Sequence, residues 1–251
     1  MSATTAACWC RSTAAAIGRW SLGVAFVLLC AGCVPHRQTA ADLQEALAWF
    51  PPTGEGEAWP PASSPPPALP AGPVAIVIAW VPAPGAPVGD GPPHVSKTTR
   101  ERWLASLRGG IARSARASRV EAAPPELFEE GFTLKGVRAV AEEHGAQLVV
   151  LFAIEVNRTR YSAFDPGTGA TGAGSRVRNV VEVVSTARVL GVTAVGEPVL
   201  SGWKMGYDTA SDHERGIEEV EEVSTRVAIE EIADLVDIRL KQLGSGRNRT
   251  R

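Results

Sequence analysis

Two short patterns in this chain match sequence motifs that perform chemistry in enzymes. The first, Gly167-Thr168-Gly169-Ala170-Thr171-Gly172, satisfies G-x-G-x-x-G, the glycine loop that holds the phosphates of a dinucleotide. Such a site needs a helix directly after the loop, because the helix N-terminus binds the pyrophosphate. Strand-like residues 177–192 follow instead. The pattern therefore predicts a hairpin loop that binds no cofactor. The alternative is that this loop contacts a partner protein.

The second pattern, Ser201-Gly202-Trp203-Lys204, matches S-x-x-K, the acyl-serine motif of penicillin-binding proteins. In that chemistry the serine and the lysine lie one helical turn apart, so that the amine reaches the hydroxyl. The residues around Ser201 are typical of a strand, in which residues three apart point to opposite faces. We therefore expect no catalytic residue here, and no other set of residues in the chain converges on a reaction.

The residues that could bind a metal ion are scattered along the chain rather than clustered. The chain contains four histidines, His36, His94, His144 and His213, and none has the spacing of a zinc site. Before the last predicted helix, Asp208, Asp212 and Glu214 lie close to His213 in the sequence. Helix capping and the helix dipole explain these residues, and a divalent-cation site is the alternative. We expect no bound metal.

Two groups of charged residues are candidates for contact with a ligand or a partner. Arg158, Arg160 and Tyr161 follow the most apolar segment of the chain, where they either bind an anionic ligand or form a solvated sheet edge. Acidic residues dominate the predicted C-terminal helix: Glu218, Glu219, Glu221, Glu222, Glu230 and Glu231. These glutamates form solvated helix faces, or an acidic face that docks a basic partner.

Cys33 lies at the end of a short apolar run. Arg11 and Arg19 precede the run Trp20–Leu29, which is too short to cross the hydrocarbon of a bilayer as a helix. The sequence Leu29-Cys30-Ala31-Gly32-Cys33 resembles the bacterial lipoprotein signal L-(A/S/T)-(G/A)-C, with Cys30 where leucine is usual. The resemblance implies that the thiol of Cys33 is acylated and that the chain is cut before it. A soluble secreted protein and an uncleaved anchor are the alternatives.

Cysteine usage fits this interpretation. The four cysteines are Cys8, Cys10, Cys30 and Cys33, all at or before the expected cleavage point. The processed chain then has no second cysteine for an intrachain disulfide, so its fold depends on its core. Acyl chains on Cys33 would give a durable membrane anchor. Val34 follows in place of the aspartate that retains lipoproteins at the inner membrane, which implies the periplasmic leaflet of the outer membrane.

The rest of the chain divides by composition. We expect a signal peptide at 1–32, a lipidated N-terminus with a short helix and a proline-rich tether at 33–73, one globular domain at 74–243, and a disordered basic tail at 244–251. Extended proline-rich segments act as semi-rigid spacers, so the tether would hold the domain away from the bilayer. Removal of Arg11 and Arg19 with the signal peptide changes the formal net charge from −2 to −4. The processed chain therefore has no excess of positive charge with which to bind nucleic acid.

Hydrophobic patterns predict an α/β (α+β) sandwich with a mixed sheet. The expected elements are a helix at 42–49, a strand at 74–81, a helix at 98–116, a short strand at 119–122, a helix at 134–144, strands at 147–156, 177–192 and 197–207, and a helix at 212–243. Thr98 or Thr99 is the expected cap of the second helix, and Ser211 and Glu214 form an expected capping box for the last one. The order predicts early β-α crossovers, late antiparallel strands and a long C-terminal helix.

The segment from Gly136 to Val150 resembles a pattern in two envelope families, the curli-secretion lipoprotein and the TolB amino-terminal domain. There, a helix ends in a tight turn, a buried strand follows, and antiparallel strands come next. The wider layout resembles the rhombotarget lipoproteins, a bacterial family without an assigned activity. Their apolar segments are matched by Val74–Pro82, Ala146–Glu155, Arg176–Gly191 and Glu197–Gly206.

Two departures from that family stand out. This chain has Gly167–Gly174 in place of an aromatic-rich turn, and no hydrophobic segment precedes Arg247, Arg249 and Arg251, so a C-terminal sorting anchor is not expected. The resemblance implies an α/β domain on a lipid anchor and transfers no catalytic residue.

We therefore expect a non-enzymatic envelope lipoprotein. Its domain would bind a protein partner or self-associate, with the membrane bound through Cys33. The alternative is a periplasmic hydrolase or a small-ligand-binding sensor, whose site would assemble from scattered Asp, His and Ser residues.

Overall fold

The computed structural model describes residues 38–61, 67, 69–83, 95–165, 176–211 and 215–245. Several residues singled out above lie outside this range: the expected lipid-bearing Cys33, the glycine loop 167–172, His36, His94, His213, Asp212, Glu214 and the tail 246–251.

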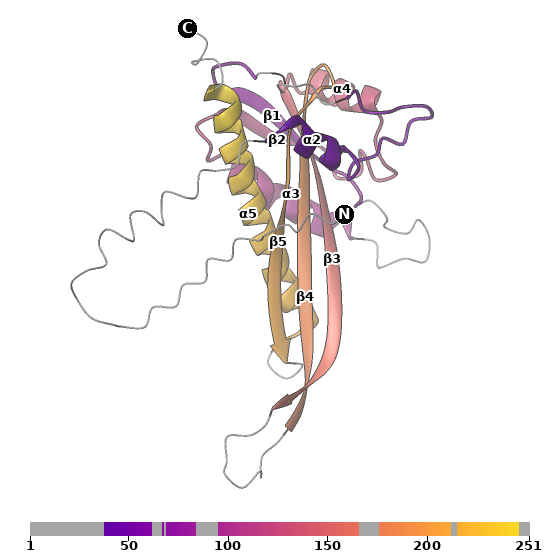
Figure 1. Ribbon diagram of the computed structural model, residues 1–251, viewed down its shortest axis with the longest axis vertical. Coiled ribbons are helices and arrows are strands. Elements are labelled where there is room, and N and C mark those ends of the chain that lie inside the picture. The colour runs from indigo at the N-terminus through magenta and orange to yellow at the C-terminus, as the bar shows by residue number, and fades with distance from the viewer. Residues whose placement is uncertain are drawn as a thin grey trace, which may run out of the picture. The chain divides into compact units, whose positions relative to one another are not determined.

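A single five-stranded sheet organises the domain, in the order β2-β1-β3-β4-β5 (Figure 1). Strand β1 (Val74–Trp80) runs parallel to both of its neighbours, β2 (Ala117–Ala122) and β3 (Leu148–Asp165). Strands β4 (Arg176–Thr193) and β5 (Pro198–Ser211) continue the sheet in antiparallel fashion. The sheet is therefore mixed, as the sequence predicts.

Helices cover both faces of this sheet. Helix α3 (Lys97–Ile111) and the 29-residue α5 (Ile217–Ser245) pack on one face, and α2 (Ala40–Leu47) and α4 (Leu134–Glu143) pack on the other. The predicted α/β architecture with a long C-terminal helix is confirmed. We call the side with α2 and α4 the front face and the side with α3 and α5 the back face.

The continuous apolar runs of β1 and β3 arise because both of their faces are buried. Val150 and Phe152 point to the back face, where they join the core beneath α3 and α5. Val149 and Leu151 point to the front face, where they join the core beneath α2 and α4. All four side chains are fully buried.

Strands β3 and β5 are longer than the sequence indicated. The apolar run of β3 ends near Val156, but the strand continues to Asp165 and pairs with β4 along its whole length. Residues 157–162 are exposed, so hydrophobic periodicity gives no signal there and backbone pairing alone defines the strand. Strand β5 reaches Ser211 rather than ending at Tyr207.

Two predicted helix starts are wrong. Ser211 is the last residue of β5, and α5 begins at Ile217, so Ser211 does not cap that helix. Ser96, rather than Thr98 or Thr99, caps α3: its hydroxyl accepts a hydrogen bond of 3.1 Å from the amide of Thr99. That helix ends at Ile111, before a turn that leads into β2.

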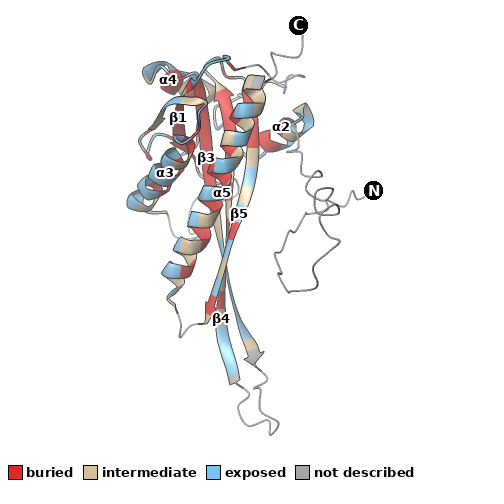
Figure 2. Ribbon diagram, turned by 90° about the vertical axis from the view of Figure 1, so that its left-hand side faces the viewer, coloured by how far each residue is buried: buried red, intermediate tan, exposed pale blue. Residues whose placement is uncertain are grey.

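The antiparallel strands extend beyond the helices of the front face (Figure 2). Pairing between β1 and β3 ends at Phe152, and β5 pairs with β4 only as far as Val180. Past that point β3 and β4 continue as a two-stranded arm, Ser162–Asp165 with Arg176–Asn179.

The segment from Gln38 to Phe50 belongs to the same folded unit. Thr39 caps α2 in a capping box with Asp42, and Leu43 and Phe50 are 0% and 1% exposed. Before the helix, Gln38 is bound to β5: its Oε1 accepts from the amide of Ser201 at 3.1 Å, and its Nε2 donates to the Ser201 hydroxyl. The chain therefore joins the domain at Gln38, well before the proline-rich segment.

Candidate functional site

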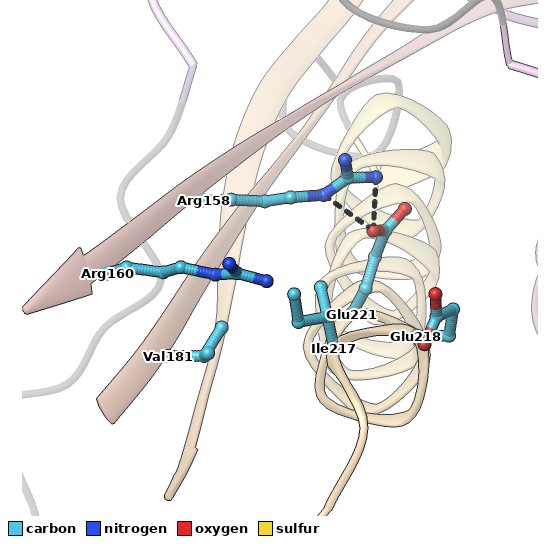
Figure 3. A pocket seen from close by; sticks show the side chains of 6 residues that line it. All are labelled: Arg158, Arg160, Val181, Ile217, Glu218 and Glu221. Carbon is cyan, nitrogen blue, oxygen red and sulfur yellow. Dashed lines mark hydrogen bonds and ion pairs between the residues drawn. The ribbon is translucent and has the colours of Figure 1, made fainter. Parts of the chain in front are cut away.

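A pocket of about 520 Å³ lies on the back face, between the outer half of β3 and the first turns of α5 (Figure 3). Six side chains line it: Arg158, Arg160, Val181, Ile217, Glu218 and Glu221. Its volume falls within the range of about 300–1,000 Å³ that is common for small-molecule sites.

Two arginines enter the pocket from β3. Arg158 and Arg160 share a face because alternate residues of a strand point the same way. The Nε and Nη2 atoms of Arg158 lie 2.8 and 2.5 Å from Oε2 of Glu221 on α5. Arg160 makes no ion pair with any of the described residues, and its side chain points towards α5 (Figure 3). One guanidinium is thus neutralised and the other is available to an anionic group.

The start of α5 closes the pocket. Ile217 and Val181 give it an apolar wall, and Glu218 adds a second carboxylate at its rim. With two guanidinium and two carboxylate groups, the lining has no net formal charge. Such a lining suits a zwitterionic or peptide-like group better than a multiply charged anion.

The structure separates the residues that the sequence grouped as an anion site. Arg158 and Arg160 share the pocket, whereas Tyr161 occupies the next position of β3 and points to the front face. Ser201 and Lys204 also point to opposite faces of their strand, β5. Ser201 binds Gln38, whereas the Nζ atom of Lys204 lies 3.2 Å from Oε2 of Glu231.

Asp208 and His144 each have an ordinary structural partner. Arg215 binds both carboxylate oxygens of Asp208, at 2.8 and 3.0 Å, just ahead of α5. His144 caps the end of α4, with its Nδ1 2.7 Å from Glu121. In the part of the chain that the structure describes, no group of three or more His, Cys, Asp or Glu residues could hold a metal ion.

The glutamates of α5 divide into paired and solvated groups. Glu221, Glu222 and Glu231 form ion pairs with Arg158, Arg102 and Lys204, respectively. The others, Glu218, Glu219 and Glu230, are exposed.

Within the described ranges, no helix is both long and apolar enough to cross a membrane.

The front face carries a feature that the sequence analysis missed. Trp203, Met205 and Tyr207 alternate along β5 and are 47%, 55% and 54% exposed. Partial desolvation, followed by the negative charge of Glu182, raises the pKa of the Tyr207 phenol. The available signal was the W-x-M-x-Y spacing on the strand predicted at 197–207, because alternate residues of a strand share one face.

Comparison with known proteins gives matches only among solved structures. No protein-family model and no curated protein matches the chain. A homologue of the neuraminyllactose-binding hemagglutinin from Helicobacter pylori is 9% identical with a TM-score of 0.42, and the match covers 71% of this chain and 96% of that one.

Two bacterial lipoproteins are also similar. Lipoprotein GNA1162 from Neisseria meningitidis is 11% identical with a TM-score of 0.30, covering 64% of this chain and 99% of its own. A minor lipoprotein from Acinetobacter baumannii is 8% identical with a TM-score of 0.29, covering 68% and 92%. At these values the likenesses carry no argument about activity.

Proposed function

We propose that this protein is a lipid-anchored lipoprotein of the bacterial envelope whose α/β domain binds a protein partner and catalyses no reaction. Acyl chains on Cys33 hold it in the periplasmic leaflet of the outer membrane. One observation carries the proposal for the domain: the outer half of β3 is a long strand edge with a pocket beside it.

The edge of β3 is suited to strand addition. From Ala153 to Asp165, β4 is the only neighbour that β3 has among the described residues, so one row of its N–H and C=O groups has no strand partner there. An extended peptide can add to such an edge through main-chain hydrogen bonds, and pockets for its alternate side chains then give specificity.

The pocket indicates what the added segment carries. Arg160 has no carboxylate partner in the described structure, whereas Arg158 forms an ion pair with the carboxylate of Glu221. A carboxylate from the added strand would complete the pairing of Arg160, while an adjacent apolar side chain would contact Val181 and Ile217. The partner that fits is an extended segment of an envelope protein that presents an acidic residue.

Site-specific crosslinking in cells tests this proposal. A photo-crosslinking residue replaces Thr159, which is exposed on β3, and a matched control replaces Glu142, which is exposed on α4. We expect one partner protein to be captured from position 159 and not from position 142, with Arg160→Glu reducing capture and Arg226→Glu leaving it unchanged. Equal capture at both positions, or none at either, would contradict the proposal.

The pocket also favours a second function, the sensing of a small anionic ligand. Its volume of about 520 Å³ and the guanidinium of Arg160 suit a compound that carries a single carboxylate. In that case the purified protein would melt at a higher temperature with a small monocarboxylate compound, and Arg160→Glu would abolish the increase. Crosslinking would then capture no protein.

A further inference from the structure

The outer half of the front face presents a row of apolar side chains to solvent. Trp203, Met205 and Tyr207 point to this face from β5, the last strand of the sheet. Helix α5 packs on the other face of that strand (Figure 1). Beside them on β4 lie Val184 and Thr186, which are half-buried. Single exposed apolar residues are common on protein surfaces, but a contiguous row marks a contact surface.

The covalent chain keeps the expected lipid anchor close to this row. Gln38 is bound to Ser201, two residues before Trp203 on β5. Cys33 precedes Gln38 by five positions, and a fully extended chain of that length spans at most about 18 Å. At about 3.3 Å per residue, Trp203 and Tyr207 lie roughly 7 and 20 Å along the strand from Ser201. The maximum length of the segment from Cys33 to Gln38 is thus similar to the distance along β5 from Ser201 to Tyr207.

The proline-rich segment does not add to this distance. It follows α2 in the sequence, and α2 is already packed in the domain through Leu43. After the segment, Leu69 is 2% exposed and Arg116 binds the backbone oxygens of Pro70 and Ala71. A spacer that begins after the chain has joined the domain cannot separate the domain from the anchor.

We propose that Trp203, Met205 and Tyr207 form a membrane-contact surface that lies against the lipid headgroups of the bilayer in which Cys33 is anchored. This inference rests on the proposed acylation of Cys33. Tryptophan and tyrosine favour the membrane interface, where an apolar ring and a polar group are both accommodated. Among the described residues beside the row, Arg188 pairs with Glu155 at 3.0 Å and Glu182 adds a negative charge near Tyr207, so the surface suits zwitterionic headgroups better than anionic ones.

A single fluorescent label can test this contact. Every natural cysteine lies at or before Cys33, so the acylated chain has no free thiol and an introduced cysteine is labelled uniquely. Met205→Cys places the label in the row, and Ile238→Cys, at an exposed position of α5 on the opposite face, is the control. Each acylated protein is reconstituted in phosphatidylethanolamine–phosphatidylglycerol vesicles, with and without brominated phosphatidylcholine. The mass of the purified protein reports acylation independently.

The expected result is a blue shift and bromine quenching for the label at position 205, with neither change at position 238. A mass that shows acylation, together with no quenching at position 205, would overturn the membrane contact and leave the anchor intact. An unacylated Cys33 would overturn both. If only added envelope proteins shield the label, the row is a protein-binding surface and the inference is wrong.

Discussion

At the scale of single residues, Arg100 is the most deeply buried charged side chain of the described structure, with 5% exposure. Its guanidinium carbon lies 4.8 Å from the ring centroid of Trp80, and its Nη2 lies 3.0 Å from Glu129. A third contact joins its Nη1 to the carbonyl oxygen of Pro125 at 3.4 Å. This one side chain therefore connects α3, the end of β1 and the loop before α4.

Replacing Arg100 should destabilise the domain. Arg100→Met keeps much of the side-chain volume but removes the cation–π contact and the ion pair, so we expect a loss of about 1–2 kcal/mol in the free energy of unfolding. Urea denaturation measures this loss. Arg108→Met, at an exposed position of the same helix, is the control and should change stability by less than about 0.5 kcal/mol.

The ion pair between Glu155 and Arg188 makes stability depend on pH. A hydrogen bond from Arg188, followed by one from Asn157, lowers the pKa of Glu155 below its usual value of 4.5. A carboxyl whose pKa is lower in the folded state stabilises the protein above its unfolded-state pKa, and this contribution is lost as the pH falls through the folded-state pKa.

Glu155→Gln should therefore be less stable than the natural protein at pH 7, by less than about 1 kcal/mol because the pair is partly exposed. The difference should vanish in acid, below the lowered pKa of Glu155. Thermal unfolding from pH 7 down to strongly acidic pH checks this, and a constant difference at every pH would argue against the ion pair.

At the scale of secondary-structure elements, the close packing of α5 against β5 depends on glycine. A Cβ atom at Gly206 would lie 1.8 Å from the carbonyl oxygen of Ser224 and 2.7 Å from the amide nitrogen of Ala228, both helix backbone atoms. Ser224 also donates a hydrogen bond of 3.0 Å to the oxygen of Gly206. The helix therefore approaches the strand as closely as its backbone allows.

Two glycine substitutions on β5 should differ in their effect. Gly206→Ala forces the helix backbone away and should cost at least about 1–3 kcal/mol. Gly202→Ala meets only the side chain of Leu235, whose Cδ2 would be 2.3 Å away and can rotate, so it should cost less. Equilibrium unfolding of both variants gives the comparison, and equal losses would show that α5 shifts freely.

At the scale of the whole molecule, the folded unit is larger than the apolar runs suggest. Phe50, which the sequence analysis assigned to the region before the domain, joins Leu47 and Val77 in the core beneath the front-face helices. The folded unit therefore includes the described residues that precede the proline-rich segment, from Gln38 to Phe50.

Truncating Phe50 tests where the folded unit begins. If the residue is part of the core, Phe50→Ala should lower the free energy of unfolding by about 3–5 kcal/mol. Glu45→Ala, at an exposed position of α2, is the control and should have little effect. Denaturation curves that coincide for Phe50→Ala and the natural protein would place Phe50 in the tether after all.

The sequence by itself determined the order of elements, the mixed sheet and the buried strands β1 and β3, because apolar periodicity is a local property of the chain. It could not determine how far β3 and β5 extend, since their outer residues are solvated and only backbone pairing orders them. Nor could it join Gln38 to Ser201, which are 163 positions apart, or set Arg158 opposite Glu221. The pocket and the attachment of residues 38–50 to the sheet both depend on such distant contacts, which only the tertiary structure decides.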